Sequence, residues 1–246
     1  MKPMERLMLD FEKLDYGNYD AITAQLNEYL LDPLVIRYNS DYATESLYHL
    51  PSEEDSEDKP EKIRGRIGLL IEYALITILH EMVEEDTNRR CAVTFNTANM
   101  FADFFIRSEA NLVLRVDVKA FHKESDEASA RFDTRSTDID AGRDYLLIVR
   151  WEWDDTVSLM QGRQIRYPKI QDALFVSCQR LAEERDWRQR ETAGGFDLDG
   201  RPLSKSGTLD TNFGKLNRIV SPSRARDLAA LDPYVRKLYE IVKKLQ

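Results

Sequence analysis

The clearest pattern along the chain is the alternation of apolar and charged residues between Leu112 and Phe121. Every second residue from Leu112 to Ala120 is apolar, whereas Arg115, Asp117 and Lys119 stand at positions between them. Successive side chains of a β-strand point to opposite faces of the sheet, so this pattern predicts a strand with one apolar and one charged face. Asp117 and Lys119 are therefore expected to lie side by side on the charged face.

Periodic patterns predict further helices and strands on both sides of this strand. Helical spacing of apolar residues runs through the first fifty residues, through the very apolar stretch from Ile63 to Glu85, and through 225–246. The run Ile170–Leu181 is also interpreted as a helix, which continues toward Trp187. Short apolar runs predict strands at 91–95, 102–107 and 145–153, and the first two should form an antiparallel meander with 112–121. We therefore expect an α/β fold with a central mixed β-sheet flanked by helices.

Polar segments divide the chain. An acidic stretch bracketed by Pro51 and Pro60 has almost no apolar residue, and Gly194–Ser223 carries five of the ten glycines. Such composition is typical of loops. We expect an N-terminal helical extension (1–50), an acidic loop (51–62), a core (63–190), and an irregular region with a C-terminal helix of the same domain (191–246).

The net charge of −9 is unevenly distributed. Residues 1–62 contain 6 Lys and Arg against 15 Asp and Glu, which leaves 29 of each sign for the rest of the chain. The segment 163–246 is basic, with 17 Lys and Arg against 11 Asp and Glu. Acidity therefore belongs to the N-terminal quarter, and a nucleic-acid partner is compatible with the remainder.

Several classes of protein are disfavoured. There is no membrane-length apolar run or signal-peptide pattern, and two cysteines support neither a disulfide framework nor a cysteine zinc site, so a cytoplasmic location is expected. The three histidines lack metal-ligand spacing, and no Gly-rich phosphate-binding motif occurs, so no nucleotide cofactor is expected.

Two carboxylates upstream of Asp117 stand in apolar surroundings. Glu72 lies among apolar residues of the predicted 63–85 helix, and Asp103 lies at the start of the 102–107 strand. A carboxylate on an apolar face is costly unless a partner or a metal compensates. Glu72 could pair with a buried arginine such as Arg115, or it could belong to a metal site with Asp103 and Asp117.

This order of helix with Glu72, strand with Asp103, and strand with Asp117-Val118-Lys119 resembles the PD-(D/E)xK superfamily of restriction-endonuclease-like nucleases. The resemblance covers roughly residues 63–185. It departs from the family pattern at Ala102, which stands where the name-giving proline would be, and at Asp117, which replaces the commoner glutamate.

The resemblance implies a Mg²⁺-dependent endonuclease that cleaves double-stranded DNA. Asp103 and Asp117 would be direct metal ligands, Glu72 would lie in or next to the metal shell, and Lys119 would act on the attacking water and stabilise negative charge. The size suits a Type II restriction endonuclease acting as a homodimer. A repair, recombination or phage-defence nuclease, or an inert DNA-binding or structural protein of the same fold, are the alternatives.

DNA contacts would come from two polar regions. Arg131 and Arg135, in the insert after the charged strand, could read guanine edges. The irregular region offers residues suited to phosphate and groove contacts: Arg201, Lys205, Lys215 and Arg218. An ordinary solvated loop is the competing interpretation for each of them.

Overall fold

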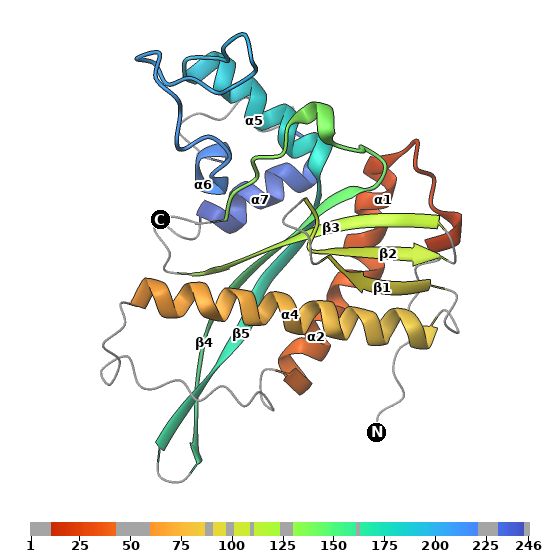
Figure 1. Ribbon diagram of the computed structural model, residues 1–246. Coiled ribbons are helices and arrows are strands. Elements are labelled where there is room, and N and C mark those ends of the chain that lie inside the picture. Colours follow the sequence, from red (N-terminus) through yellow and green to blue (C-terminus); the bar gives the residue numbers. More distant parts are fainter. Residues whose placement is uncertain are drawn as a thin grey trace.

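The computed structural model describes residues 11–42, 60–86, 91–96, 101–108, 111–123, 130–160, 163–220 and 231–243. Its centre is a five-stranded mixed sheet with helices around it (Figure 1). The strands are β1 (Cys91–Phe95), β2 (Phe104–Ser108), β3 (Asn111–His122), β4 (Asp144–Met160) and β5 (Arg163–Ser177). The main helices are α1 (Tyr19–Gln25), α2 (Asp32–Arg37), α4 (Pro60–Asp86), α5 (Cys178–Thr192), α6 (Leu216–Ile219) and α7 (Pro233–Lys243). None of the helices described is long and apolar enough to cross a membrane.

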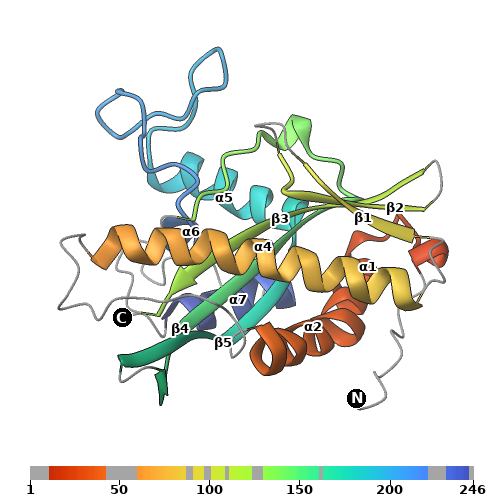
Figure 2. The same cartoon turned by 60° about the horizontal axis from the view of Figure 1, so that its bottom comes forward.

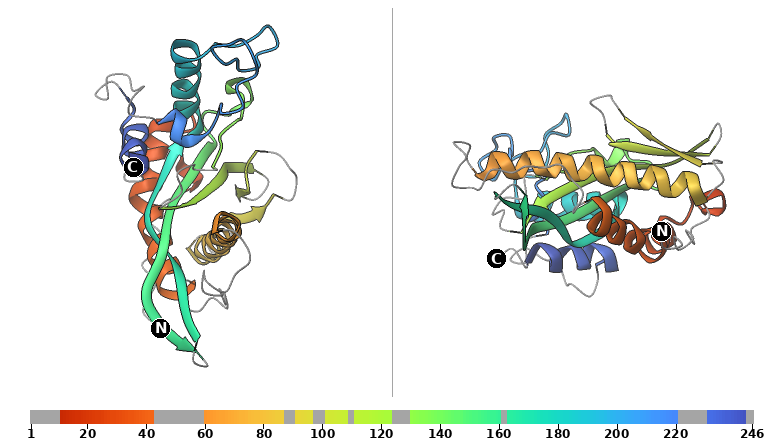
Figure 3. Two further views of the ribbon diagram at one scale, coloured as in Figure 1. Left: turned by 90° about the vertical axis from the view of Figure 1, so that its left-hand side faces the viewer. Right: turned by 90° about the horizontal axis from the view of Figure 1, so that it is seen from below.

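The strands are ordered β1-β2-β3-β4-β5 across the sheet. β1, β2 and β3 form the expected antiparallel meander, β4 lies parallel to β3, and β5 returns antiparallel to β4. The β4–β5 hairpin runs past the other three strands (Figures 1 and 3). The predicted mixed sheet flanked by helices is therefore confirmed.

Apolar side chains pack on both faces of the sheet. Along β4, Tyr145, Leu147 and Val149 belong to one buried cluster, whereas Leu146 and Ile148 belong to a second. Alternate residues of a strand point to opposite faces, so the two clusters lie on opposite sides of the sheet. The first cluster includes buried residues of α1, α2 and α4, and the second those of α5, α6 and α7. Figure 2 shows α4 running along the first face.

The N-terminal helices join the core and also cover an edge of the sheet. Asn27 donates to the Phe175 carbonyl at 2.9 Å and accepts from the Phe175 N–H at 3.0 Å. Asn39 makes the same pair of bonds to Ile170, each 2.9 Å long. Each side-chain amide thus replaces the peptide group of a missing neighbouring strand along β5.

Several element boundaries differ from the sequence prediction. The predicted helix over Ile170–Leu181 is wrong for Ile170–Ser177, which is the end of β5; only Cys178 onward is helical. Leu174–Ser177 is buried on both faces and paired with β4, and a short continuous apolar run has the same appearance in a buried strand and a buried helix. α4 begins at Pro60, so 60–62 belong to a helix and not to the acidic loop, whose residues 51–59 lie outside the described part. α7 begins at Pro233, after an Asp232 cap, and 225–230 lie outside the described residues.

Two segments without regular structure are fastened to each other beside α5. Phe132 N–H donates to the Gly214 carbonyl at 2.8 Å, and Leu216 N–H donates to the Ala130 carbonyl at 3.1 Å. The buried Arg185 guanidinium donates to the carbonyls of Phe132 and Thr134. The segments 130–143 and 194–215, far apart in sequence, are therefore joined where residues 130–133 meet residues 211–216 (Figure 1).

Candidate functional site

The candidate site lies where one edge of β3 is no longer paired with a neighbouring strand. β2 begins at Phe104, opposite Val116, and no described strand pairs with β3 beyond this point on that side. The Val118 N–H on this edge donates to Oδ2 of Asp103 at 2.6 Å, and the Ala120 N–H donates to the carboxylate of Glu72. Carboxylates from two different elements thus replace the missing strand.

Asp103 is aimed by a sharp backbone turn at Ala102. Ala102 is buried and has φ of +82°, a left-handed conformation that L-residues other than glycine rarely adopt. Asn96 secures the turn, because its side-chain amide donates to the Ala102 carbonyl at 2.8 Å and its N–H donates to the Asp103 carbonyl at 2.9 Å. Proline is fixed near φ −65°, so the name-giving proline of the resembled family is incompatible with this turn. The predicted strand at 102–107 accordingly starts two residues later.

Glu72 reaches the same edge because α4 lies close to β3. Gly68, one turn before Glu72, faces Ala120, and a Cβ added to Gly68 would stand 3.3 Å from the Ala120 carbonyl oxygen. A side chain at position 68 would therefore crowd β3. The glycine sets the spacing that lets the Glu72 carboxylate meet the Ala120 N–H.

Asp117 and Lys119 form an ion pair on the face of β3 that points away from α4. Their neighbours Val116 and Val118 belong to the α4-side core cluster, which places Asp117 and Lys119 on the opposite face. Lys119 Nζ lies 2.7 Å from Oδ2 of Asp117, with 22% and 12% of the two side chains exposed. The predicted adjacency of these two side chains on one strand is therefore what the structure has.

The four side chains influence one another's ionisation. Burial and the nearby Asp103 charge raise the pKa of Glu72 to about 7, against the Lys119 ammonium and the Ala120 N–H, which lower it. Burial raises the pKa of Asp117 to about 6; Lys119 opposes this shift, and Asp103 adds to it through repulsion and a shared hydrogen bond. Burial alone would lower the pKa of Lys119, but the surrounding carboxylates bring it above its ordinary value. The cluster thus has more negative charge than one ammonium offsets.

The chemistry of this donor set fits a hard divalent cation. Asp103 and Asp117 are close enough to share a hydrogen bond, a place that either a proton or a cation can fill, and Mg²⁺ is commonly held by one or two carboxylates with water completing the shell. In the described part of the chain, however, no three Asp, Glu, His or Cys side chains are gathered as a ready ligand set. Glu72, Asp103 and Asp117 each accept a donor from the protein, so they would have to turn to take up a metal.

Comparison with protein-family models, with curated proteins and with solved structures finds no match to this chain. The resemblance to the PD-(D/E)xK superfamily therefore rests on the residues alone. It involves Asp103, Asp117 and Lys119, with Glu72 reaching them from α4.

Arg115, which was considered as a partner for Glu72, pairs with a different carboxylate in the structure. Its guanidinium makes two hydrogen bonds to the fully buried carboxylate of Asp144, at the start of β4. This pair lies next to the parallel β3–β4 junction, where Arg115 is opposite Asp144 in the register. Glu72 is consequently not neutralised by Arg115.

The six residues predicted to contact DNA lie in the segments 130–143 and 194–215 and in α6. They differ in whether they form ion pairs and in how exposed they are. Arg131 donates to the carbonyls of Thr211 and Phe213 and pairs with Asp133 at 3.0 Å, so it holds the two segments together. Arg201 pairs with Asp197 and Asp199. Lys215 is half-buried, and the remaining three side chains are exposed: Arg135, Lys205 and Arg218.

Sequence reasoning missed the residues that shape the site without being charged. Asn96, Ala102 and Gly68 fix the positions of Asp103 and Glu72 through backbone contacts. The only sequence signal was a glycine in the middle of a very apolar helix, which usually marks close packing. Asn96 and Ala102 carry no comparable signal.

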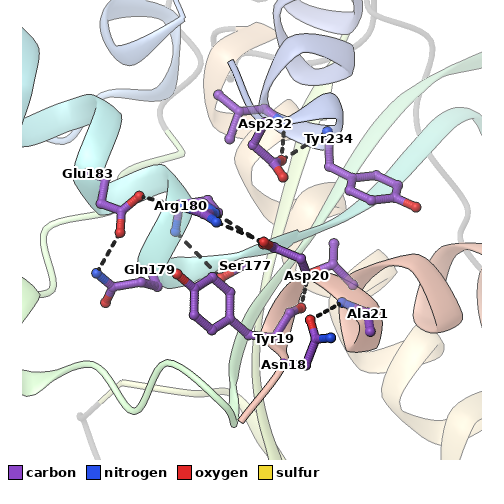
Figure 4. A network of polar contacts seen from close by, with 12 residues as sticks. Asn18, Tyr19, Asp20, Ala21, Ser177, Gln179, Arg180, Glu183, Asp232 and Tyr234 are labelled. Carbon is purple, nitrogen blue, oxygen red and sulfur yellow. Dashed lines mark hydrogen bonds and ion pairs between the residues drawn. The ribbon is translucent and has the colours of Figure 1, made fainter. Parts of the chain in front are cut away.

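A second polar cluster lies at the junction of α1, α5 and α7 (Figure 4). Arg180 makes two hydrogen bonds to Asp20, at 3.0 and 2.7 Å, and a third to Glu183, and its guanidinium lies over the Tyr19 ring. Asp232 caps α7 by accepting from the N–H groups of its first turn. A cavity of about 370 Å³ lies among these residues, and the carboxylates of Asp20, Glu183 and Asp232 all accept hydrogen bonds, from Arg180 or from the first turn of α7. The cluster joins three helices and is a structural ion-pair network.

Proposed function

We propose that the protein is a Mg²⁺-dependent endonuclease that hydrolyses phosphodiester bonds in double-stranded DNA. The observation that carries the proposal is that Glu72, Asp103, Asp117 and Lys119, from three parts of the chain, come together at the edge of β3 that no described strand pairs with. The same residues carry the resemblance to the PD-(D/E)xK superfamily. By analogy with that superfamily, we further propose site-specific cleavage of the Type II restriction kind by a homodimer.

The residues divide the work as follows. A bound Mg²⁺ would relieve charge on the phosphate and lower the pKa of a coordinated water. Asp103 and Asp117 would hold the ion, with Glu72 in or next to its shell. Lys119 keeps a raised pKa among these carboxylates, so its ammonium is suited to holding the attacking water and stabilising negative charge, and poorly suited to removing a proton.

One observation favours a second candidate, an inert protein of the same fold. Every carboxylate of the site already accepts a donor from the protein, as expected where carboxylates merely satisfy a bare strand edge. A repair, recombination or phage-defence nuclease would share the chemistry of the first candidate and differ in substrate.

Incubation with mixed DNA substrates tests these candidates. The purified protein should cut a mixture of plasmid, viral genomic DNA and branched oligonucleotides with Mg²⁺ and leave it intact in EDTA, and the fragment ends should be sequenced. Ends that share one short sequence support restriction, and cutting confined to branch points supports the repair alternative. Binding without cutting favours the inert protein, and equal cutting in EDTA would exclude the metal mechanism.

Two variants test the named residues. Asp117→Asn and Lys119→Ala should each lower the cleavage rate at least ~100-fold. DNA affinity should change little, because binding comes mostly from contacts away from the scissile phosphate. Lys237→Ala, which removes an exposed lysine on α7, is the matched control and should cut normally. Normal turnover by Lys119→Ala would mean that Asp117 and Lys119 are only a structural ion pair.

A further inference from the structure

The β1–β2 pair has one covered and one open face. Residues of the covered face are buried in the cluster beneath α4: Cys91, Val93, Phe104 and Ile106. Residues of the other face are half-buried or exposed: Ala92, Thr94, Phe105 and Arg107. In Figure 3 α4 lies on one face of β1 and β2, and no described helix lies on the other. The open face is therefore accessible to a partner.

Arg107 lies on this open face, where neighbouring side chains fix its orientation and no described carboxylate neutralises its charge. Its guanidinium lies 5.0 Å from the centroid of the Phe105 ring, and its Nε donates to the Thr94 hydroxyl at 3.4 Å. Among the described residues no carboxylate pairs with it, and it is the sole charged residue in the sequences of β1 and β2. Stacking on Phe105 and the Nε hydrogen bond orient the guanidinium group of Arg107. Its two terminal nitrogens, the fork of the group, are left to donate to other acceptors.

The open face continues into the candidate site. Asp103, Phe105 and Arg107 alternate along one side of the chain leading through β2, so Arg107 lies ~13 Å from Asp103 at the usual rise per residue. Asp117 and Lys119 also face away from α4, on the neighbouring strand β3. A ligand held between Asp103 and Asp117 would thus extend over Arg107 if it were long and followed the sheet.

We propose that this open face binds the phosphate backbone of the DNA substrate, with Arg107 contacting a phosphate that flanks the one at Asp103 and Asp117. The inference rests on the proposed function. Charge selects the occupant: an oriented guanidinium fork without a carboxylate matches a phosphate oxygen pair, and the acidic site alone would repel a polyanion. Arg107 therefore supplies attraction beside a site whose own charge opposes DNA.

The test measures binding of the full-length protein to a labelled duplex of random sequence, in EDTA, over a range of salt concentrations. Arg107→Ala should weaken binding about tenfold. The slope of log affinity against log salt should fall by about 0.9, the value for one phosphate contact. Arg107→Lys keeps the charge without the fork, so it should keep the slope and lose only part of the affinity. Arg236→Ala, which removes an exposed arginine on α7 beside the opposite edge of the sheet, should bind as wild type does.

The outcomes of this test separate the inference about Arg107 from the nuclease proposal. If wild type binds and cuts DNA while Arg107→Ala matches Arg236→Ala in affinity and slope, the inference is overturned and the nuclease proposal stands. If wild type neither binds nor cuts DNA, both fall. A dimer that becomes monomeric in Arg107→Ala on gel filtration would assign the face to a second copy of the chain instead. If Arg107→Ala unfolds at a lower temperature, Arg107→Gln, which removes the charge and keeps a longer side chain beside Phe105, carries the slope comparison.

Discussion

The backbone of Ala102 decides how Asp103 enters the site. Its φ of +82° is held by Asn96 and by the ladder bond from the Asp103 N–H to the Val116 carbonyl. A non-glycine residue in this conformation costs of order 1–3 kcal/mol and persists only where the surroundings enforce it. Sequence could nominate Asp103 as the first acidic residue, but the turn that aims it depends on contacts that no local pattern records.

Substitution of Ala102 separates strain from function. Ala102→Gly should raise the free energy of unfolding by about 1 kcal/mol and keep cleavage, because glycine adopts positive φ without a steric penalty. Ala102→Pro should destabilise the protein, because its φ is fixed on the negative side. Urea denaturation measures both, with Ala92→Gly on β1 as a control that should lose stability. A stability loss in Ala102→Gly would contradict the strain described here.

The pKa of Glu72 predicts a pH-dependent cost in the metal-free protein. The pKa is raised from 4.5 to about 7, so the folded state binds this proton more tightly than the unfolded state. The associated stability is present below pH 4.5 and is lost as the pH rises through 7. Glu72→Gln has no such proton, and Gln can still accept from Ala120. In EDTA its stability relative to wild type should therefore increase between these pH values, by at most about 3 kcal/mol.

Thermal and urea unfolding across that pH range check this prediction. Added Mg²⁺ provides the control, because a bound cation would favour the ionised carboxylate and flatten the difference. A difference between Glu72→Gln and wild type that is independent of pH in EDTA would show that Glu72 is not the titrating group.

At the scale of elements, the sequence predicted α4, the β1–β2–β3 meander and β4, because each is long or clearly periodic. It mistook the end of β5 for helix, since Ala173–Val176 is a continuous apolar run whose identity as a strand is set by pairing with β4. It also placed Glu72 on a buried side of α4 without revealing which strand it would meet. That information lies in the close approach of α4 to β3 at Gly68.

Two glycines of α4 form a matched pair for testing this approach. A Cβ at Gly65 would meet nothing within 4 Å, whereas one at Gly68 would crowd the Ala120 carbonyl. Gly65→Ala should therefore stabilise the protein by about 0.5–1 kcal/mol through helix propensity and leave cleavage unchanged. Gly68→Ala should gain less or lose stability and should lower the cleavage rate, because Glu72 moves with the helix. Equal behaviour of the two variants in denaturation and cleavage assays would show that the spacing is unimportant.

At the scale of the whole molecule, the sheet ends in edges that receive side chains instead of strands. Asn27 and Asn39 pair with β5, and Asp103 and Glu72 accept from β3. The sequence suggested that Glu72 and Asp103 lie near Asp117, but it did not point to their bonds with the β3 backbone, to the bonds of Asn27 and Asn39 with β5, or to the fastening of 130–143 against 194–215. They join residues far apart in the chain, and periodicity describes only neighbours.

The capped edge of β3 has a consequence for how molecules of this protein meet one another. Strand edges with unpaired N–H groups are templates for association between chains, and a negatively charged side chain over such an edge discourages it. The combined variant Glu72→Ala and Asp103→Ala uncovers the N–H groups of Val118 and Ala120, so we expect it to aggregate at concentrations where wild type stays dispersed. Light scattering compares it with Asp199→Ala combined with Glu240→Ala, which removes the same charge from exposed positions. Equal scattering by the two would mean that charge alone, and not the bare strand, governs aggregation; otherwise the carboxylates proposed for catalysis also keep the protein from polymerising through its own sheet.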